Sequence, residues 1–266
     1  MKYDLVFIVL VYRNTTDLED FFVSLRIPNA KVIVVNSYYD NKSEETFKRI
    51  ASENNADFFS VPNKGYGTGN NRGVEYAMAH YSFKYLVISN ADIEIQELNV
   101  KDLNDLQHGI YAPSIHTLSG KQQNPHMPYY ISVFDDMKYY FYKKNNWHAI
   151  MFFCAINKVF RMCFSLCSKL GAREVYSAHG AFVIISSDIC KQLFPFYDEN
   201  VFLFTEEENL AQVARINGVK TYYVPEISIR HKEDGSTSTI SEKQRDITRD
   251  SFIKFYNKWH NNTAKS

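Results

Sequence analysis

The sequence predicts an α/β fold in which a mostly parallel sheet is flanked by helices. In the first third of the chain, short apolar runs rich in β-branched residues alternate with amphipathic segments. Residues 4–12 and 31–37 are apolar runs of strand length, as expected for strands that are buried on both faces. Between them, residues 15–25 place Leu18 and Phe21 at helical spacing. Repeated strand–helix–strand order is typical of a sheet with right-handed crossovers.

The remaining elements follow in the same way. In the first half we expect a helix at 43–55, a strand at 56–63, a glycine-rich loop at 63–73, a helix at 74–81 and a strand at 85–90. In the second half we expect a strand at 111–115, a loop at 120–130, a strand and helix within 180–193, a helix at 205–218, a strand at 219–226 and a terminal helix at 241–260.

The chain predicts one continuous domain, because no linker rich in Pro, Gly or Ser divides it. Its first part covers residues 1–98. The second part, 99–240, contains an aromatic and basic tract at about 139–170, and the C-terminal helix lies within 241–266.

Composition narrows the class of protein. The chain has 30 Lys and Arg against 30 Asp and Glu, so its overall charge does not indicate a nucleic-acid partner. Its four cysteines form no Cys-x-x-Cys pair, which favours structural thiols in a reducing, cytoplasmic setting. The N-terminal apolar run is short and contains Asp4, so we interpret it as a strand and not as a targeting segment.

A polar pair follows one of the buried strands. Asn90 and Asp92 end the run at 85–90 and, two residues apart on an extended chain, point the same way. Ligands of open parallel sheets bind beyond the carboxyl ends of the strands. Their oxygens suit Mg²⁺ or Mn²⁺. The alternative is that both side chains only turn the chain.

The glycine-rich segment 63–73 is a second candidate. Glycines such as Gly67 let the backbone approach a ligand, and Asn70, Asn71 and Arg72 offer side-chain donors. The segment has neither the phosphate-loop nor the dinucleotide-binding pattern. An ordinary flexible turn explains it equally well.

Two further candidates are a run of three glutamates and a histidine. Glu206, Glu207 and Glu208 begin the helix expected at 205–218, where carboxylates are favoured by the helix dipole. One of them could act as a general base for a hydroxyl. His231 follows a strand and becomes functionally interesting if it faces Asp92.

The order of these motifs resembles that of the family 2 glycosyltransferases, in particular the rhamnosyltransferase-like branch of bacterial cell-surface polysaccharide synthesis. The resemblance covers about residues 4 to 236 and is carried by the glycine and asparagine segment, by "SNAD" and by the acidic helix with its downstream Pro and His. It implies a GT-A fold, a Rossmann-like sheet with a smaller mixed acceptor-side region. It also implies inverting transfer from a dTDP- or UDP-sugar to a glycan or lipid-linked acceptor, assisted by Mg²⁺ or Mn²⁺.

On the donor side, the resemblance assigns Asn90 and Asp92 to the metal motif, with Asp92 as the ligand. His231 completes the metal or pyrophosphate site, and Asn36 contacts the nucleotide base. Gly67, Asn70, Asn71 and Arg72 then belong to the donor site. Asn replaces the common Asp at both 36 and 90.

On the acceptor side, the resemblance assigns the catalytic base to Glu207, with Glu206 as its neighbour. Gly180 and Ala181 begin the strand that borders the acceptor pocket. Glu207 stands where the family has Asp, so the base is displaced by about one bond length.

The tract at 139–170 mixes bulky aromatic and apolar residues with Lys and Arg. One interpretation is a buried helix with a solvated face. The other is an amphipathic segment that lies at the inner face of the cell membrane and brings the enzyme to a lipid-linked acceptor.

Two other functions stay open. The departures at 36, 90 and 207 are compatible with a degenerate sugar-nucleotide-binding subunit. A sugar nucleotidyltransferase is less favoured, because those enzymes usually carry a basic glycine-rich loop after the first strand, where this chain has "VYRNTTDLEDF".

Overall fold

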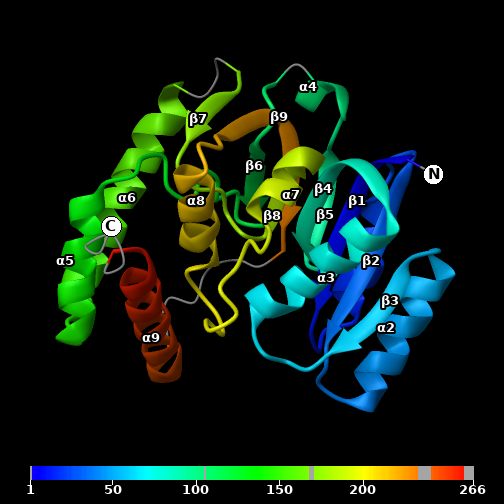
Figure 1. Cartoon of the computed structure of the whole chain (residues 1–266), viewed down its shortest axis with the longest axis horizontal. Coiled ribbons are helices and arrows are strands. Elements are labelled where there is room, and N and C mark those ends of the chain that lie inside the picture. The colour runs from blue at the N-terminus through cyan, green and yellow to red at the C-terminus, as the bar shows by residue number, and fades with distance from the viewer. Residues whose placement is uncertain (1, 105, 168–170, 233–240, 261–266) are drawn as a thin grey trace.

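A mixed nine-stranded sheet forms the centre of the molecule (Figure 1). The computed structural model describes residues 2–104, 106–167, 171–232 and 241–260. The strands lie in the order β3-β2-β1-β4-β8-β6-β9-β5, and β7 pairs with β9. This arrangement confirms the predicted α/β class with a mixed second half.

The element bounds are as follows. The strands are β1 Lys2–Val11, β2 Ala30–Ser37, β3 Asp57–Val61, β4 Ser82–Asn90, β5 Ile93–Glu97, β6 Ile110–Thr117, β7 Arg173–Val175, β8 Phe182–Ser186 and β9 Thr221–His231. The helices are α1 Thr16–Ser24, α2 Asn41–Glu53, α3 Tyr66–His80, α4 Lys101–Asn104, α5 Ser132–Lys143, α6 Trp147–Cys167, α7 Ser187–Leu193, α8 Glu206–Ile216 and α9 Glu242–Trp259.

The pairing of the strands brings distant segments to one edge of the sheet. Strands β1, β2, β3 and β4 are parallel, and β8 is antiparallel to both β4 and β6. Strand β9 is parallel to β6 and antiparallel to β5, in a register that places Ile93 opposite His231. The carboxyl end of β4 and the end of β9 therefore meet.

Apolar side chains cover the sheet on both faces. Alternate β1 residues such as Phe7 pack with Leu18 of α1 and Phe47 of α2. Their neighbours, such as Ile8, pack with Val74 of α3 on the opposite face, to which α7 and α8 also contribute. Burial of both faces requires the continuous apolar runs found in β1 and β2.

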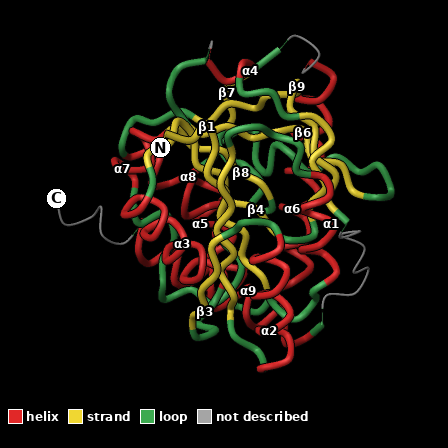
Figure 2. Tube along the Cα trace, turned by 90° about the vertical axis from the view of Figure 1, so that its right-hand side faces the viewer, coloured by secondary structure: helices red, strands yellow, loops and turns green. Residues whose placement is uncertain are grey.

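Helices α5, α6 and α9 build a separate hydrophobic core away from the sheet. It contains Tyr142, Ile150, Phe252 and Phe255. Figure 1 shows these three helices side by side at the end of the molecule opposite β3, and Figure 2 gives the view turned by 90°. Among the described residues, no helix has the length and apolarity that crossing a membrane requires.

The glycine-rich segment differs from the predicted loop. Helix α3 begins at Tyr66, so most of the segment is helical. A β-carbon at Gly67 would lie 2.7 Å from Cβ of Tyr197, and one at Gly73 would lie 2.3 Å from Cγ2 of Ile8. The glycines therefore let α3 pack against the sheet and the loop before α8, and this packing outweighs their low helix propensity.

Candidate active site

Two asparagines flank the end of β1 at the carboxyl edge of the sheet. Asn36 of β2 lies opposite Val11, and Asn90 of β4 lies opposite Leu10. Asn36 is fully buried, and its Nδ2 donates to Oγ of Ser60 at 3.0 Å. Its Oδ1 is buried with no hydrogen-bond partner among the described residues. A buried acceptor of this kind can receive a hydrogen bond from a ligand at the sheet edge.

Asp92 and His231 form the second part of the edge. Asp92 Oδ2 lies 3.2 Å from His231 Nε2, because the β5–β9 register brings the two residues together. His231 Nδ1 lies 2.8 Å from Oε1 of Gln123, a carbonyl oxygen that can only accept. Nδ1 can therefore donate to Gln123, and Nε2 is the ring nitrogen that faces the Asp92 carboxylate.

This arrangement fits a divalent cation. An imidazole nitrogen and a carboxylate oxygen are both ligands of divalent metals, and here they lie 3.2 Å apart. Adjacent ligands of an octahedral Mg²⁺, each about 2.1 Å from the ion, lie about 3 Å apart. Asp92 and His231 meet that spacing, and the Asp92 side chain is 25% exposed, so a ligand can reach it.

Tyr66 joins this edge to the strand that borders the next pocket. Its hydroxyl lies 2.8 Å from the Gly180 carbonyl oxygen and 3.1 Å from Oδ1 of Asn90. The backbone N–H of Asn90 donates to the Ala181 carbonyl at 2.9 Å. Gly180 and Ala181 directly precede β8. These two residues, which we expected beside the acceptor pocket, therefore also contact the carboxyl edge of the sheet at Asn90, Gly180 through the Tyr66 hydroxyl.

Glu207 lies on the other side of Gly180. Its Oε1 accepts a hydrogen bond from the Gly180 amide at 3.1 Å. A β-carbon at position 180 would lie at the same 3.1 Å from Oε1, which is tighter than ordinary contact. Gly180 therefore fixes one carboxylate oxygen of Glu207 and leaves the other for a ligand.

Glu206 and Glu208, the two neighbours of Glu207 in the chain, have pKa values shifted in opposite directions. Burial, reinforced by the charge of Glu207, raises the pKa of Glu206 to about 8, so Glu206 is mostly neutral at pH 7. Burial alone would also raise the pKa of Glu208, but the His126 imidazole, 3.8 Å away, holds that pKa down to about 2. The same carboxylates raise the pKa of His126 against the effect of its burial. Glu207 and Glu208 thus favour the protonated form of His126.

A row of buried histidines links the two parts of the site. The ring of His179 lies 6.1 Å from that of His126 and 6.0 Å from that of His231, measured between centroids. Burial and the two neighbouring rings lower the pKa of His179 well below its usual range. Its Nδ1 accepts from the Ala181 amide at 3.1 Å, so the ring is held neutral and in place.

A cavity of about 650 Å³ opens beside Glu207 and Glu208. Helices α5, α6 and α9 supply aromatic walls that include Phe134, Phe153 and Phe252. Its volume lies within the usual range for small-molecule sites, and its lining combines apolar walls with a few charged groups, as such sites do. The carboxylate of Glu207 therefore faces a space large enough for a sugar.

Solved structures with a similar backbone cover most of the chain. S. aureus TarS (residues 1–349) has a TM-score of 0.59 at 11% identity over 98% of this chain and 74% of TarS. The fold is that of the GT-A glycosyltransferases. GalNAc-T7, solved with UDP, GalNAc and Mn²⁺, has a TM-score of 0.58 at 12% identity over 90% of this chain and 46% of its own. The mannosyltransferase PcManGT from Pyrobaculum calidifontis, solved with GDP-Man and Mn²⁺, has a TM-score of 0.54 at 12% identity over 89% of this chain and 59% of its own.

Comparison of sequences gives a match to only part of the chain. No protein-family model matches the chain. The low-salt glycan biosynthesis hexosyltransferase Agl10 of Haloferax volcanii is 26% identical over 117 residues, which are 42% of this chain and 36% of Agl10. The match thus spans about a third of that curated relative. The GT-A fold rests on the structural comparisons.

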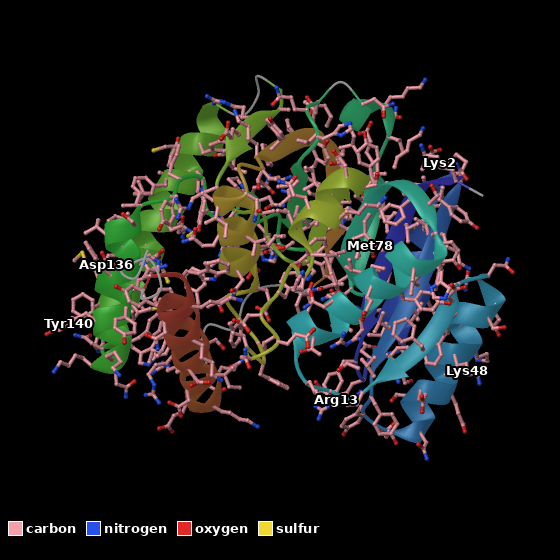
Figure 3. The ribbon with its side chains drawn as sticks, viewed as in Figure 1. Lys2, Arg13, Lys48, Met78, Asp136 and Tyr140 are labelled. Carbon is pink, nitrogen blue, oxygen red and sulfur yellow. The ribbon has the colours of Figure 1, made fainter. Side chains whose placement is uncertain are left out.

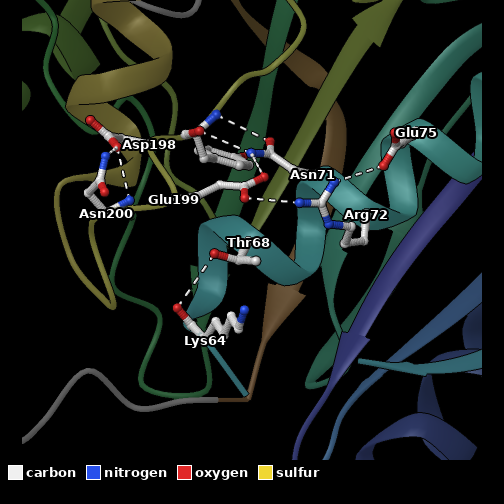
Figure 4. Close-up of polar contacts among 9 residues, drawn as sticks. Lys64, Thr68, Asn71, Arg72, Glu75, Asp198, Glu199 and Asn200 are labelled. Atoms are coloured by element: carbon white, nitrogen blue, oxygen red, sulfur yellow. Dashed lines mark hydrogen bonds and ion pairs between the residues drawn. The ribbon is translucent and has the colours of Figure 1, made fainter. Parts of the chain in front are cut away.

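Within the GT-A fold, the polar residues of α3 hold the structure together. Asn71 Nδ2 donates to the Tyr197 carbonyl at 3.0 Å, and Arg72 pairs with Glu199 at 3.0 Å and with Glu75 (Figure 4). The first amide of the helix, that of Tyr66, donates to the Phe202 carbonyl. These groups are used within the protein and fix the position of α3.

Asn70 differs from its neighbours on α3. Its Nδ2 donates to the Tyr66 carbonyl at 3.1 Å, and its buried Oδ1 has no hydrogen-bond partner among the described residues. Gly67 packs against Tyr197. Both residues therefore support Tyr66, whose hydroxyl reaches Asn90.

Several site residues of this GT-A fold were not predicted from the sequence. They are Tyr66, Gln123, His126 and His179. The contact between Glu208 and His126 was not predicted either. Tyr66 lies within the glycine-rich segment and His179 directly before Gly180, so their places in the motifs were a signal. His126 and Gln123 lie in a segment that has only the character of a loop, and their roles follow from tertiary contacts alone.

Proposed function

We propose that this protein is an inverting glycosyltransferase that moves a sugar from a nucleoside diphosphate to an acceptor hydroxyl. One observation carries the proposal. The ring of His231, which contacts Asp92, lies 6.0 Å from the ring of His179, and the next residue, Gly180, holds the Glu207 carboxylate that faces the cavity. A donor and an acceptor can thus meet at the Gly180 peptide.

The donor lies along the sheet edge in this proposal. The free Oδ1 of Asn36 accepts from the nucleotide base, and Asp92 and His231 hold Mg²⁺ or Mn²⁺. When bound, the cation stabilises the negative charge of the departing diphosphate. The side chain of Asn90 carries no charge, and the Tyr66 hydroxyl donates to its amide oxygen. The Mn²⁺ in the structures of GalNAc-T7 and PcManGT supports this assignment.

The acceptor occupies the cavity, and Glu207 is the general base. A neutral hydroxyl is a weak nucleophile near pH 7. Glu207 takes its proton while the hydroxyl oxygen bonds to the anomeric carbon, and the bond from that carbon to the diphosphate oxygen breaks with its electron pair. Attack opposite the leaving group inverts the configuration. Gly180 holds Oε1 of Glu207, and the contact with the His126 imidazole favours the ionised form of Glu208 beside it.

A ligand screen tests the donor assignment. We expect one of UDP, dTDP, GDP or CMP to raise the melting midpoint by about 5 to 10 °C at a hundred times its Kd, and Mn²⁺ or Mg²⁺ to enlarge the shift. A dTDP response favours a rhamnose donor. Release of the nucleoside diphosphate from the matching sugar nucleotide distinguishes an enzyme from a degenerate binding subunit. A response to nucleoside triphosphate plus sugar phosphate alone would instead indicate a nucleotidyltransferase.

The outer surface of α5 and α6 supports an acceptor carried on a membrane. Seven of the fifteen exposed large apolar side chains among the described residues lie there: Val133, Met137, Tyr140, Met151, Phe152, Val159 and Met162. An eighth, Tyr129, lies just before α5. Figure 3 shows Tyr140 at the outer edge of the molecule. Helix α6 carries Lys158 and Arg161 and no carboxylate. This combination favours an anionic lipid surface over a second copy of a chain with zero net charge.

Vesicle flotation tests the membrane contact. We expect the protein to float with anionic vesicles at low salt and to dissociate as salt screens the charges. Phe152→Ser combined with Val159→Ser should abolish flotation. As a control, Val23→Ser combined with Ile216→Ser, which changes exposed apolar residues on α1 and α8, should leave it intact. Equal flotation of both double variants would contradict the proposal.

A further inference from the structure

We propose that the cavity beside Glu207 contains a phosphate subsite, and that the acceptor is therefore a saccharide linked to a phosphate group. The subsite consists of Lys121, Lys158 and Arg161, all of which line the cavity. The inference rests on the proposed function, because it specifies the acceptor of that same site. It adds a chemical requirement for that acceptor.

The three cations lie at one side of the cavity. The guanidinium of Arg161 donates to the Gln122 carbonyl, and Gln122 directly follows Lys121. Lys158 lies one turn before Arg161 on α6. The charges of both Arg161 and Lys121 also contribute to the lowered pKa of the buried His179.

These cations lack carboxylate partners in the part of the chain that the structure describes. None of the ion pairs there includes Lys121, Lys158 or Arg161, whereas Lys138 of the same cavity pairs with Asp135 at 3.1 Å. Burial lowers the pKa of Arg161, although a guanidinium keeps its charge in proteins. Arg161 is partly buried, where positive charge without a carboxylate partner is unfavourable and an anionic ligand would compensate it.

The position of the cluster relative to the base is suitable for a sugar linked to phosphate. Asn157 of α6 donates to the His126 carbonyl at 2.9 Å, so one helix holds both the His126 loop and Arg161. His126 in turn contacts Glu208, next to Glu207. The anion therefore lies on the α6 side of the cavity and the reacting hydroxyl on the α8 side, with aromatic walls between them.

A phosphate matches the subsite better than a carboxylate. Three cations exceed the single charge of a uronic acid, whereas a phosphodiester or diphosphate offers more oxygens and up to two charges. Arginine binds phosphate through two parallel hydrogen bonds, and lysine binds it as a point charge. The donor diphosphate is assigned to Asp92 and His231, so this second anion belongs to the acceptor.

Calorimetric titration without metal tests the subsite. Excess EDTA removes the cation at Asp92 and His231. The probes are octyl glucosyl phosphate, glucose 1-phosphate and the uncharged octyl glucoside. We expect octyl glucosyl phosphate to bind at least about tenfold more tightly than octyl glucoside at low salt, and high salt to reduce the difference.

A matched pair of charge variants provides the control. Lys121→Gln combined with Lys158→Gln should lower the affinity for octyl glucosyl phosphate to about that for octyl glucoside. Lys143→Gln combined with Lys144→Gln removes the same charge from exposed positions outside the cavity lining and should change neither affinity. All four lysines are exposed, so the melting temperatures should stay close to that of the wild type.

Each outcome has a defined meaning. Equal binding of the charged and neutral octyl probes, or full retention of phosphate binding in the Lys121 and Lys158 variant, would overturn the subsite. Tighter binding of octyl glucosyl phosphate than of glucose 1-phosphate indicates a lipid-linked acceptor, whereas equal binding indicates a soluble one. If the nucleotide and metal still stabilise the protein, loss of the subsite leaves the proposed function intact.

Discussion

Glu207→Gln is expected to reduce turnover by about a thousandfold while leaving the fold and donor binding intact. The substituted amide still offers an oxygen to the Gly180 N–H, so the side chain keeps its place. It cannot take the proton of the acceptor hydroxyl. The measurement is kcat at saturating donor, together with the nucleotide-induced thermal shift, which should equal that of the wild type.

The adjacent Glu206 provides the matched control for that experiment. Because the pKa of Glu206 is raised to about 8, its side chain is mostly neutral at pH 7, and Glu206→Gln replaces a neutral acid with a neutral amide of similar shape. We expect turnover close to that of the wild type at this pH. If Glu206→Gln caused the larger loss, the base would be misassigned.

Asp92→Ala is expected to abolish the metal-dependent part of nucleotide binding and to lower turnover by about a hundredfold or more. The substitution leaves Nε2 of His231 as the remaining protein ligand opposite Gln123. The measurement compares the thermal shift with nucleotide alone and with nucleotide plus Mn²⁺. In the wild type the cation enlarges the shift, and in the variant the two values should coincide.

Glu94→Gln controls for the loss of a carboxylate near this site. Glu94 lies two residues further along, where it forms a partly exposed pair with Arg230 at 3.3 Å. Such pairs contribute about 0–1 kcal/mol, so metal dependence and stability should change little. A metal response that survives in Asp92→Ala but is lost in Glu94→Gln would place the cation elsewhere.

The meeting of Asn36 and Asn90 at one edge of the sheet can be predicted from local pattern. The strands that contain them are continuous apolar runs, and parallel strands bring their carboxyl ends to one edge. The meeting of Asp92 with His231 depends on the β5–β9 register, which joins segments far apart in the chain. The sequence indicates that contact only through its resemblance to a family.

The rest could not be predicted because it depends on close packing. Gly67 and Gly73 have the local character of a loop, and only their contact with Tyr197 and Ile8 makes a helix favourable. The segment around His126 shows no hydrophobic periodicity that would indicate a role for this residue. Its role depends on Glu208, and their pKa shifts arise from burial together with proximity, which one-dimensional spacing does not encode.

The separate core of α5, α6 and α9 has a consequence for how such proteins diversify. Tyr142, Ile150, Phe252 and Phe255 pack with one another and belong to neither core of the central sheet. Substitutions that reshape this helical unit therefore need not disturb Asn36 on β2 or Asp92 in the turn between β4 and β5. Under the proposed function, acceptor preference can then change by drift or by laboratory selection in the helical unit, while the residues proposed to bind the nucleotide stay unchanged in the sheet.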